Sequence, residues 1–308
     1  MDKPTPIVSV CMITYNQAEF IQQAIIGVLN QKCNFEFELI LSNDSSKDQS
    51  NQIILNTIKN HPNGGRVKYF FQANNLGMNK NLKFALENCS GKYVAMCEGD
   101  DYWIDTLKLQ KQVDFLEAND DFALCFHSVD VLFQDGSIVK DFFIKDVFDK
   151  SDSTIYDLAA FGNYIHTPSV VFRNNFLKLS DNFIKSPIGD YYLWILISQH
   201  GKIKKISEVM ATYRIGVGYF SSKSEEDRAF LFLSTLELIS ANVENRTVSQ
   251  VLKCKIDALK FRKLPHYLRN SHFNDEFSNP KFISSFISIK TLILAIFEKV
   301  KRRYKLIF

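Results

Sequence analysis

The order of apolar and polar residues in the first hundred positions follows two repeats in turn. Continuous apolar runs, which are typical of strands buried on both faces of a sheet, occupy residues 7–13, 38–41, 67–71 and 93–97. Between these runs, apolar residues recur at helical spacing in segments 19–29, 50–59 and 82–86. The alternation predicts parallel strands joined by right-handed helical crossovers, and therefore an α/β fold.

After about residue 105 the pattern changes. We expect helices over 106–117 and 191–199, and strands over 123–133, 169–172 and 203–213. From residue 221 onward the spacing of apolar residues is helical. The pattern therefore predicts one domain over residues 1–220, with halves 1–104 and 105–220, and a helical C-terminal region over 221–308.

Polar residues follow three of the four predicted strands of the first half. They are Thr14-Tyr15-Asn16, Asn43-Asp44-Ser45-Ser46 and Glu98-Gly99-Asp100-Asp101. Because open α/β sheets bind ligands beyond the carboxyl ends of their strands, we expect the three groups to meet at one edge. Each group alone has a simpler interpretation: Asn16 as a helix cap, residues 43–46 as an Asx or Ser turn, and the acids as a cap of the next helix.

The last of these groups places three carboxylates within four residues, at Glu98, Asp100 and Asp101. Carboxylates this close repel one another, and burying them is costly without a compensating cation. A hard divalent ion such as Mg²⁺ or Mn²⁺ prefers oxygen ligands and leaves positions open for substrate phosphates. Gly99 allows the backbone to turn and to approach a ligand closely. The cluster therefore predicts a metal site.

Five stretches of the chain, taken in order, resemble the bacterial family 2 glycosyltransferases of the GT-A fold. They are Val8-Ser9-Val10 through Thr14-Tyr15-Asn16; Asn43-Asp44-Ser45-Ser46; Asn75-Leu76-Gly77 with Gly91-Lys92-Tyr93; the run from Cys97 to Trp103; and Gly189-Asp190 followed by 208–214. An ordered set of this length is far more specific than any one motif. The resemblance covers about residues 5 to 220 and implies a Rossmann-like, mostly parallel sheet flanked by helices, with a helical C-terminal extension.

The resemblance implies transfer of a sugar from a nucleotide-diphosphate sugar, expected to be UDP-linked, to an acceptor hydroxyl with inversion. It assigns the nucleotide-sugar donor to Thr14, Tyr15, Asn16, Asp44, Asn81, Glu98 and Gly99. It assigns a divalent metal, Mn²⁺ or Mg²⁺, to Asp100 and Asp101. It makes Asp190 the catalytic base, although a residue that opens an apolar helix would equally suit a helix cap. The acceptor it implies is a saccharide or a lipid-linked saccharide, in cell-surface polysaccharide or lipopolysaccharide synthesis.

The chain departs from the family pattern at two places. Gly216 stands where many relatives carry a His that would be a third metal ligand, and Asn81-Leu82 stands where many have an Ala-Arg pair. The first departure favours an alternative function, in which a degenerate member binds nucleotide sugar or a partner without turnover. The chain lacks the G-x-G-x-x-G turn of dinucleotide-binding enzymes and the G-x-x-x-x-G-K-[ST] loop of P-loop enzymes.

Composition narrows the class of protein further. The net charge of +3 gives no reason to expect a nucleic-acid partner, and a hydrophobic content of 46% is typical of a globular protein. The six cysteines show no metal-ligand spacing and suit a reducing compartment. We interpret His127 and His166 as structural histidines. Because no signal-peptide pattern and no apolar run of about 20 residues is present, we expect a cytoplasmic protein.

The C-terminal region carries a pattern of its own. Between residues 282 and 304, apolar residues recur at helical spacing, at Phe286, Ile289, Ile293, Ile296, Phe297 and Val300. Five basic residues are concentrated at the end, namely Lys299, Lys301, Arg302, Arg303 and Lys305. The pattern suits an interfacial helix on the anionic inner face of the cell membrane, and it equally suits a helix that packs on the domain.

Overall fold

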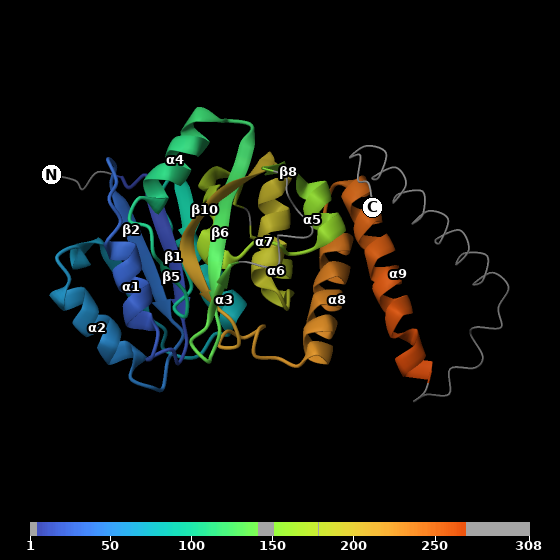
Figure 1. Cartoon of the computed structure of the whole chain (residues 1–308), viewed down its shortest axis with the longest axis horizontal. Coiled ribbons are helices and arrows are strands. Elements are labelled where there is room, and N and C mark those ends of the chain that lie inside the picture. The colour runs from blue at the N-terminus through green and yellow to red at the C-terminus, as the bar shows by residue number, and fades with distance from the viewer. Residues whose placement is uncertain (1–4, 141–150, 178, 269–308) are drawn as a thin grey trace.

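The computed structural model describes residues 5–140, 151–177 and 179–268, and it is built around one large sheet (Figure 1). Within these residues, ten strands follow the order β3-β2-β1-β4-β9-β6-β10-β5, with β7 paired to β6 and β8 paired to β10. The first four strands are β1 (Val8–Thr14), β2 (Phe37–Asn43), β3 (Val67–Phe71) and β4 (Tyr93–Met96). The others are β5 (Tyr102–Trp103), β6 (Phe122–Leu132), β7 (Ile138–Lys140), β8 (Asp152–Ser153), β9 (Val171–Arg173) and β10 (Lys202–Arg214).

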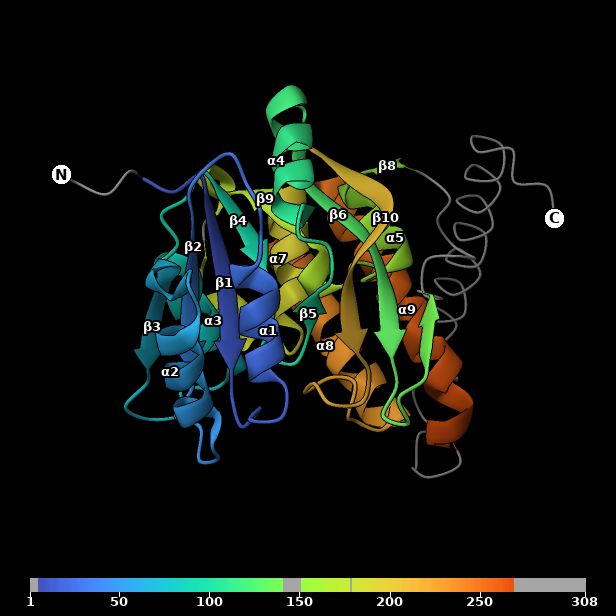
Figure 2. The same cartoon turned by 60° about the vertical axis from the view of Figure 1, so that its left-hand side comes forward.

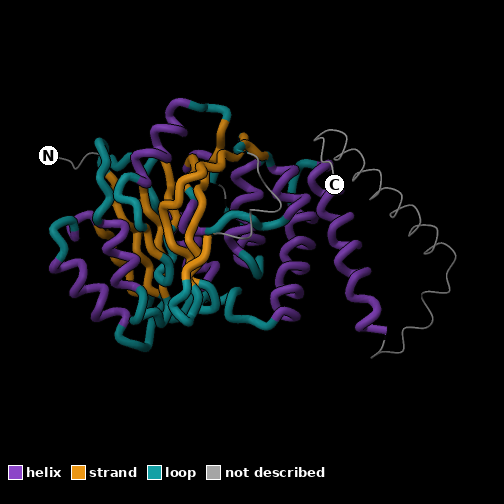
Figure 3. The backbone as a smooth tube through the Cα atoms, in the orientation of Figure 1, coloured by secondary structure: helices purple, strands orange, loops and turns teal. Residues whose placement is uncertain are grey.

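Helices cover both faces of the sheet (Figures 2 and 3). One face is covered by α1 (Ile21–Leu29), α2 (Ser50–Asn60) and α4 (Lys108–Ala118). The other is covered by α3 (Met78–Glu87), α5 (Ile155–Phe161), α6 (Asp181–Lys185), α7 (Gly189–Ser198), α8 (Glu225–Asn242) and α9 (Arg246–Leu268). The helical region that follows residue 221 therefore packs on the same core as α7.

The central strands contribute to both hydrophobic cores because successive side chains of a strand point to opposite faces. In β1, Val8, Val10 and Met12 pack on the α1 side, whereas Cys11 and Ile13 pack on the α3 and α7 side. All seven residues of β1 are buried. Burial on both faces is the physical reason for the continuous apolar runs in the sequence.

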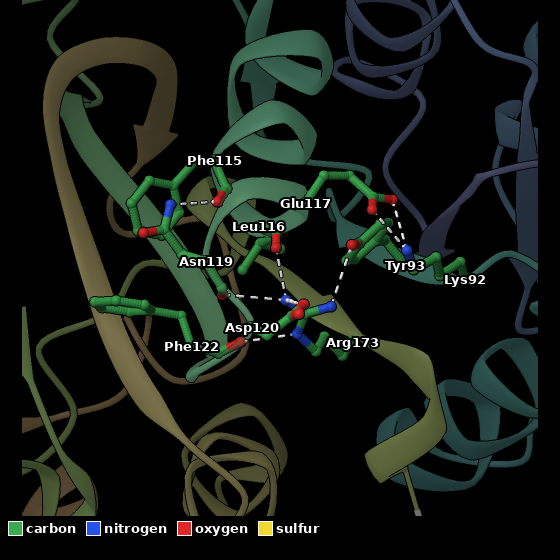
Figure 4. A network of polar contacts seen from close by, with 9 residues as sticks. All are labelled: Lys92, Tyr93, Phe115, Leu116, Glu117, Asn119, Asp120, Phe122 and Arg173. Atoms are coloured by element: carbon green, nitrogen blue, oxygen red, sulfur yellow. Dashed lines mark hydrogen bonds and ion pairs between the residues drawn. The ribbon is translucent and has the colours of Figure 1, made fainter.

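The sheet changes direction at β9, which pairs antiparallel with both β4 and β6, whereas β1, β2, β3 and β4 run parallel. Arg173, at the end of β9, is buried and donates hydrogen bonds to the carbonyls of Phe122 (2.9 Å) and Leu116 (2.6 Å) and to the Tyr93 hydroxyl (3.2 Å) (Figure 4). These bonds tie β9 to α4, β4 and β6. The two halves of the chain are thus joined inside one sheet.

The predicted strands and helices of residues 7–133 and 169–213 are confirmed, with ends that agree to within two residues except at α3, which begins four residues before the predicted segment 82–86. The region after residue 221 is helical as far as residue 268, in α8 and α9. The segment 282–304 lies outside the described residues. In the part of the chain that is described, no helix has the length and apolar character needed to cross a bilayer.

Candidate active site

The polar ends of β1, β2 and β4 meet at one edge of the sheet, as the sequence predicts. The amide of Asp44 donates a hydrogen bond to the carbonyl of Thr14 (2.9 Å), and the amide of Gly99 donates to the carbonyl of Ile13 (3.0 Å). Strand register holds the ends of β1 and β2 at the same level, because Thr14 pairs with Asn43, whereas β4 ends opposite Cys11 and its polar residues continue from there. We call this set of side chains the acidic edge; its members are Thr14, Asp44, Glu98, Asp100 and Asp101.

The loops that follow β1 and β2 are bonded to each other. Asn16 adopts a positive φ of 52°, and its Oδ1 accepts a hydrogen bond from the amide of Lys47 (2.7 Å). The Asn43 side chain accepts from the amide of Ser46 (2.9 Å), which closes the Asx-type turn that the sequence allowed. The interpretation of Asn16 as a helix cap is wrong, because the N-cap residue of α1 is Phe20. Asn16 instead fixes one loop against the other.

Asp44 and Tyr15 differ in how open they are. The carboxylate of Asp44 is buried and accepts hydrogen bonds from the amides of Leu76 (2.7 Å) and Gly77 (3.0 Å), so it organises the loop before α3. Tyr15 is 45% exposed, which leaves its ring accessible next to the acidic edge. An accessible ring beside a buried carboxylate can offer stacking and hydrogen-bond acceptance to a base and a ribose.

Asn81 differs from the other predicted site residues because its amide group is used inside the fold. Its Oδ1 accepts from the hydroxyl of Ser42 (2.6 Å), and its Nδ2 donates to the carbonyl of Ser42 (3.1 Å). The side chain is almost fully buried and is absent from the lining of the cavity described below. The contact joins α3 to β2, and the structure does not bring Asn81 to the acidic cluster.

One carboxylate oxygen from each of three residues lies within 4.8 Å of the others, and these residues are Glu98, Asp100 and Asp101. Gly99 permits this arrangement, since a Cβ at that position would lie 2.5 Å from Gln17 Oε1 and 2.9 Å from Oγ1 of Thr14. The acids do not cap the next helix, because α4 begins only at Lys108, after β5. The helix-cap interpretation of this cluster is therefore wrong.

The electrostatics of the cluster suit a divalent cation. Burial raises the pKa of Glu98 and of Asp101 well above their usual values, and repulsion from Asp100 raises both further. Asp101 Oδ1 accepts from the amide of Arg214 (2.8 Å), whereas its buried Oδ2 has no hydrogen-bond partner among the described residues. A buried acceptor of this kind, beside two further carboxylates, fits the oxygen ligands that Mn²⁺ and Mg²⁺ prefer.

Asp190 lies in the first turn of α7, with its carboxylate held by three donors. Its Oδ1 accepts from the amide of Tyr191 (2.6 Å), and its Oδ2 accepts from Asn163 Nδ2 (3.1 Å) and Thr167 Oγ1 (3.2 Å). Burial raises the pKa of Asp190, and these three hydrogen bonds oppose the rise. The N-cap of α7 is Ile188, so the helix-cap interpretation of Asp190 is wrong. We call Asp190, Asn163 and Thr167 the Asp190 cradle.

A cavity of about 710 Å³ connects the acidic edge to the Asp190 cradle. Glu98 and Asp100 line it from the end of β4, Asp190 lines it from α7, and residues of α8 complete it. The charge on Asp190 contributes to the raised pKa of Glu98, which shows that the two carboxyl groups sense each other across the cavity. The volume lies within the range of about 300–1,000 Å³ that is usual for small-molecule sites.

His166 also lines this cavity, although the sequence favoured a structural role for it over a place in a loop that faces the acceptor. Its ring packs on the ring of Tyr213, with 4.7 Å between centroids, and its charge lowers the pKa of Asp190. Tyr213 lines the same cavity, and its position at the end of β10 brings it close to the acidic cluster. The interpretation of His166 as a structural histidine is therefore incomplete, because the residue packs on Tyr213 and also lines the cavity.

The loop after β10 approaches the acidic cluster at Gly218 rather than at Gly216. Gly216 has a φ of 85°, and a Cβ there would lie 2.9 Å from Gln134 Nε2. A Cβ on Gly218 would instead lie 3.1 Å from Asp100 Oδ2. Gly218 lines the cavity, whereas Gly216 does not. The position that the resemblance equates with a metal-binding His therefore points away from the acids in this chain.

A layer of buried groups supports the site from behind. Trp103 Nε1 donates to the carbonyl of Pro168 (2.8 Å), and Gln112 Nε2 donates to the carbonyl of Ser169 (2.9 Å). Both bonds hold the 3₁₀ turn Thr167–Ser169, which carries one donor to Asp190. Lys108 is fully buried, donates to Gln112 Oε1 (2.7 Å) and lies 4.1 Å from the centre of the Trp103 ring. The acidic edge and the Asp190 cradle are thereby linked.

Comparison with known proteins places this site in a family. Residues 9–142 match the family model described as glycosyl transferase family 2. An uncharacterized glycosyltransferase of Methanocaldococcus jannaschii is 30% identical over 229 residues, which cover 70% of this chain and 72% of that protein. The chain belongs to glycosyl transferase family 2. An uncharacterized protein of Mycobacterium tuberculosis is 36% identical over 208 residues, or 67% of this chain, and this chain spans only 58% of its length.

One further relative and two solved structures of other proteins are similar to this chain. A UDP-Glc:α-D-GlcNAc-diphosphoundecaprenol β-1,3-glucosyltransferase of Escherichia coli is 27% identical over 218 residues, covering 70% of this chain and 80% of that protein. The structure of Staphylococcus aureus TarS (residues 1–349) with UDP-GlcNAc superposes with a TM-score of 0.62 at 19% identity, over 87% and 77% of the two chains. Mannosyltransferase PcManGT of Pyrobaculum calidifontis, in complex with GDP-Man and Mn²⁺, has a TM-score of 0.60 at 14% identity, over 98% and 88%. The GT-A fold is thus confirmed.

Proposed function

We propose that this protein transfers a sugar from a UDP-linked donor to an acceptor hydroxyl with inversion. The observation that carries the proposal is the common cavity, which Glu98, Asp100 and Asp190 all line. A leaving-group site and a base on one cavity are the two requirements of a single displacement at the anomeric carbon. The E. coli relative, which uses UDP-Glc, and the TarS complex with UDP-GlcNAc support UDP as the nucleotide.

In the proposed reaction, Asp190 accepts the proton of the acceptor hydroxyl as that oxygen attacks the donor sugar. The amide of Tyr191 and the side chains of Asn163 and Thr167 fix its carboxylate and favour the ionised form. Burial raises the pKa of Asp190, and a carboxylate with a higher pKa is a stronger base because it binds the proton more tightly. Tyr15 and Asp44 are proposed to hold base and ribose, with Thr14, Asn16 and the Glu98-Gly99 segment completing the donor site.

We further propose that Asp100 and Asp101, together with Glu98, hold Mn²⁺ or Mg²⁺. The Oδ2 of Asp101, which has no partner among the described residues, and the raised pKa values of Glu98 and Asp101 support this, as does the structure of PcManGT in complex with Mn²⁺. When bound, such an ion supplies Lewis-acid stabilisation of the diphosphate that leaves. The alternative function, binding without turnover, was based on Gly216 in place of a histidine. Gly216 does not line the cavity, so the absence of a histidine there does not argue against turnover.

The test is release of UDP from UDP-glucose with Mn²⁺ and candidate saccharide acceptors, for the wild type and for Asp190→Asn. Because base catalysis contributes about 10²–10⁴-fold, the variant should lose turnover by roughly that factor while UDP affinity is unchanged. Asp181→Asn, which changes an exposed carboxylate in α6, is the matched control and should behave as wild type. Near wild-type turnover of Asp190→Asn would contradict the assignment, and thermal unfolding curves show whether each variant is folded.

For the acceptor and the place of action, we propose a lipid-linked saccharide at the inner face of the cell membrane, in surface-polysaccharide synthesis. The E. coli relative acts on a diphosphoundecaprenol-linked sugar, and the apolar and basic pattern of residues 282–305 suits an anionic membrane surface. Co-sedimentation with anionic and with neutral vesicles tests this for the full chain and for a chain that ends at Asn279. Equal binding of the two chains, or binding indifferent to lipid charge, would contradict it.

A further inference from the structure

The wall that α8 adds to the cavity differs in chemistry from the acidic edge. Its lining residues are Glu225, Arg228, Ala229 and Phe232, which recur at helical spacing and so form one face of α8. We call these four residues the α8 wall. Arg228 is the cationic side chain, of Lys or Arg type, among the described residues that line the cavity. The wall therefore brings a positive charge to a cavity that four carboxylates line, namely Glu98, Asp100, Asp190 and Glu225 of the same wall.

The guanidinium of Arg228 is available for a ligand. None of the described residues forms a hydrogen bond or an ion pair with it, and Glu225, one turn earlier, is exposed and unpaired with it. A guanidinium that lines a cavity presents up to five N–H donors in a planar fork, and this geometry matches the oxygens of a phosphate or carboxylate. Arg228 is therefore suited to bind an anion inside the cavity.

The rim of the cavity next to the α8 wall is apolar and exposed. Three aromatic residues of the lining are accessible to solvent: Phe161 is 46% exposed, Tyr219 is 53% exposed and Phe220 is 37% exposed. Two separate segments contribute them, the end of α5 and the loop that precedes α8. Exposed aromatic side chains grouped at the mouth of a cavity mark a surface that binds an apolar ligand or partner.

Charge and size restrict what this combination can hold. An anion would be repelled by the four carboxylates of the lining, Glu225 included, so it binds only where its oxygens contact the guanidinium of Arg228 directly. A cavity of about 710 Å³ accommodates a saccharide and an anionic linkage, whereas a long hydrocarbon chain must continue along the rim. The ligand that meets all three conditions carries a sugar, then an anionic linkage, then an apolar chain.

We propose that the α8 wall and the aromatic rim bind the linkage and the chain of a lipid-diphosphate saccharide acceptor, with Arg228 as the ligand of its diphosphate. This inference rests on the proposed transfer reaction, because it takes the hydroxyl at Asp190 to belong to the acceptor. Arg228 and the rim then set the acceptor class, since they hold the linkage while the terminal sugar reaches the Asp190 cradle. Phe161, Tyr219 and Phe220 contact the first part of the apolar chain.

The experiment measures binding of farnesyl diphosphate, inorganic pyrophosphate and farnesol to the full chain by isothermal titration calorimetry in EDTA. Without metal the acidic edge repels diphosphate, so Arg228 governs what is measured. Wild type should bind farnesyl diphosphate at least about tenfold more tightly than pyrophosphate or farnesol, because contacts to the apolar chain and to the diphosphate both contribute to its affinity. Arg228→Gln should weaken it by about tenfold or more, since hydrogen bonds from a charged donor are lost.

Two controls separate this site from general effects. Arg246→Gln removes an exposed positive charge at the start of α9 and should leave the affinity for farnesyl diphosphate unchanged. Phe220→Ser should weaken farnesyl diphosphate and leave pyrophosphate unaffected. Equal affinities of wild type and Arg228→Gln, or equal loss in both arginine variants, would overturn the proposal. Pyrophosphate that binds as tightly as farnesyl diphosphate would overturn the lipid part of it.

The measurements distinguish failure of this site from failure of the proposed reaction. Binding of UDP with Mn²⁺ to wild-type protein reports on the acidic edge, and farnesyl diphosphate in EDTA reports on the α8 wall. If the protein binds UDP with Mn²⁺ but Arg228→Gln has no effect, the proposed function stands and the proposed acceptor site is overturned. A chain that shows the Arg228 effect and no UDP binding keeps a lipid-diphosphate site and loses the proposed reaction.

Discussion

The acidic edge and the Asp190 cradle face the same cavity, but they are built in different ways. The edge consists of residues that directly follow β1, β2 and β4, and parallel pairing alone brings them together. The cradle consists of Asn163, Thr167 and Asp190, which lie on two segments more than twenty residues apart and on no common strand. The family match, over residues 9–142, includes the edge and ends before the cradle.

Under the proposed function, this difference corresponds to the two substrates. A nucleotide diphosphate and a metal are common to many donors, so a site that follows from strand order serves them all. An acceptor varies, and a site assembled from loops and helix ends can change without disturbing the sheet. We therefore expect substitutions in the edge to abolish turnover for every acceptor, and substitutions around the cradle to change rate or acceptor choice.

The largest effect is expected in the edge. Asp100→Asn retains the size of the side chain and removes one charge from the cluster, so turnover should fall by at least about 10²-fold and metal-dependent nucleotide binding should fall with it. UDP-release assays with titrated Mn²⁺ measure both. Asp105→Asn, which alters an acid paired with Lys111 outside the cavity, is the matched control. Retained activity, or indifference of the wild type to EDTA, would show that the edge binds no catalytic metal.

The junction between the two regions should affect stability rather than turnover. Burial lowers the pKa of Lys108 to about 7, whereas an unfolded lysine titrates near 10.4. Between these values the unfolded chain binds the extra proton, so stability should rise with pH, by about 3 kcal/mol more in wild type than in Lys108→Met from pH 7 to 10. Urea unfolding at several pH values measures this difference. Parallel pH curves for the two proteins would mean that Lys108 stays charged.

A smaller effect is expected from the cradle. Thr167→Val removes a hydrogen bond to the ionised carboxylate of Asp190, so the pKa of the base should rise and the turnover at neutral pH should fall by about tenfold. Since the base must be ionised, activity is lost as pH falls through this pKa, and the acid limb of the kcat/KM profile should move to higher pH. The profile measures it, with Thr247→Val in α9 as the control. If the acid limb does not move, the Thr167 hydroxyl does not influence the pKa of the base.

The smallest effect tests the loop over the edge. Gly216→His should not lower the Mn²⁺ concentration for half-maximal activity, because Gly216 points toward Gln134, and it should destabilise the fold by about 1 kcal/mol through its positive φ. Gly218→Ala should instead raise the Mn²⁺ requirement, since its Cβ would meet Asp100 Oδ2. Thermal unfolding and metal titration measure both. A gain in Mn²⁺ affinity in Gly216→His would contradict this and would show that residue 216 reaches the metal site, as the family resemblance implies.

The strand-end groups were predictable because each motif stands beside the strand that positions it. The apolar run of β1 predicts a buried strand, and Thr14 follows at its end, so its place at the edge needs no further information. Asn163, His166 and Arg228 carried no such signal. Each lies next to residues of ordinary composition, and only the packing of α5, α7 and α8 on one core brings them to the cavity. Asn81 is the opposite case. The family resemblance suggested that it contacts the donor, whereas its buried side chain accepts a hydrogen bond from Ser42.

The sequence by itself determined the α/β fold, the alternation of strands and helices in the first hundred residues and the acidic edge, because local periodicity is a property of neighbouring residues. Tertiary structure alone decided that Asp190 meets Asn163 and Thr167, that Gly218 and not Gly216 approaches Asp100, and that Arg228 enters the cavity. The physical reason is separation along the chain. Contacts between distant segments depend on how helices pack against the sheet, and that packing is set by the whole core rather than by any single motif.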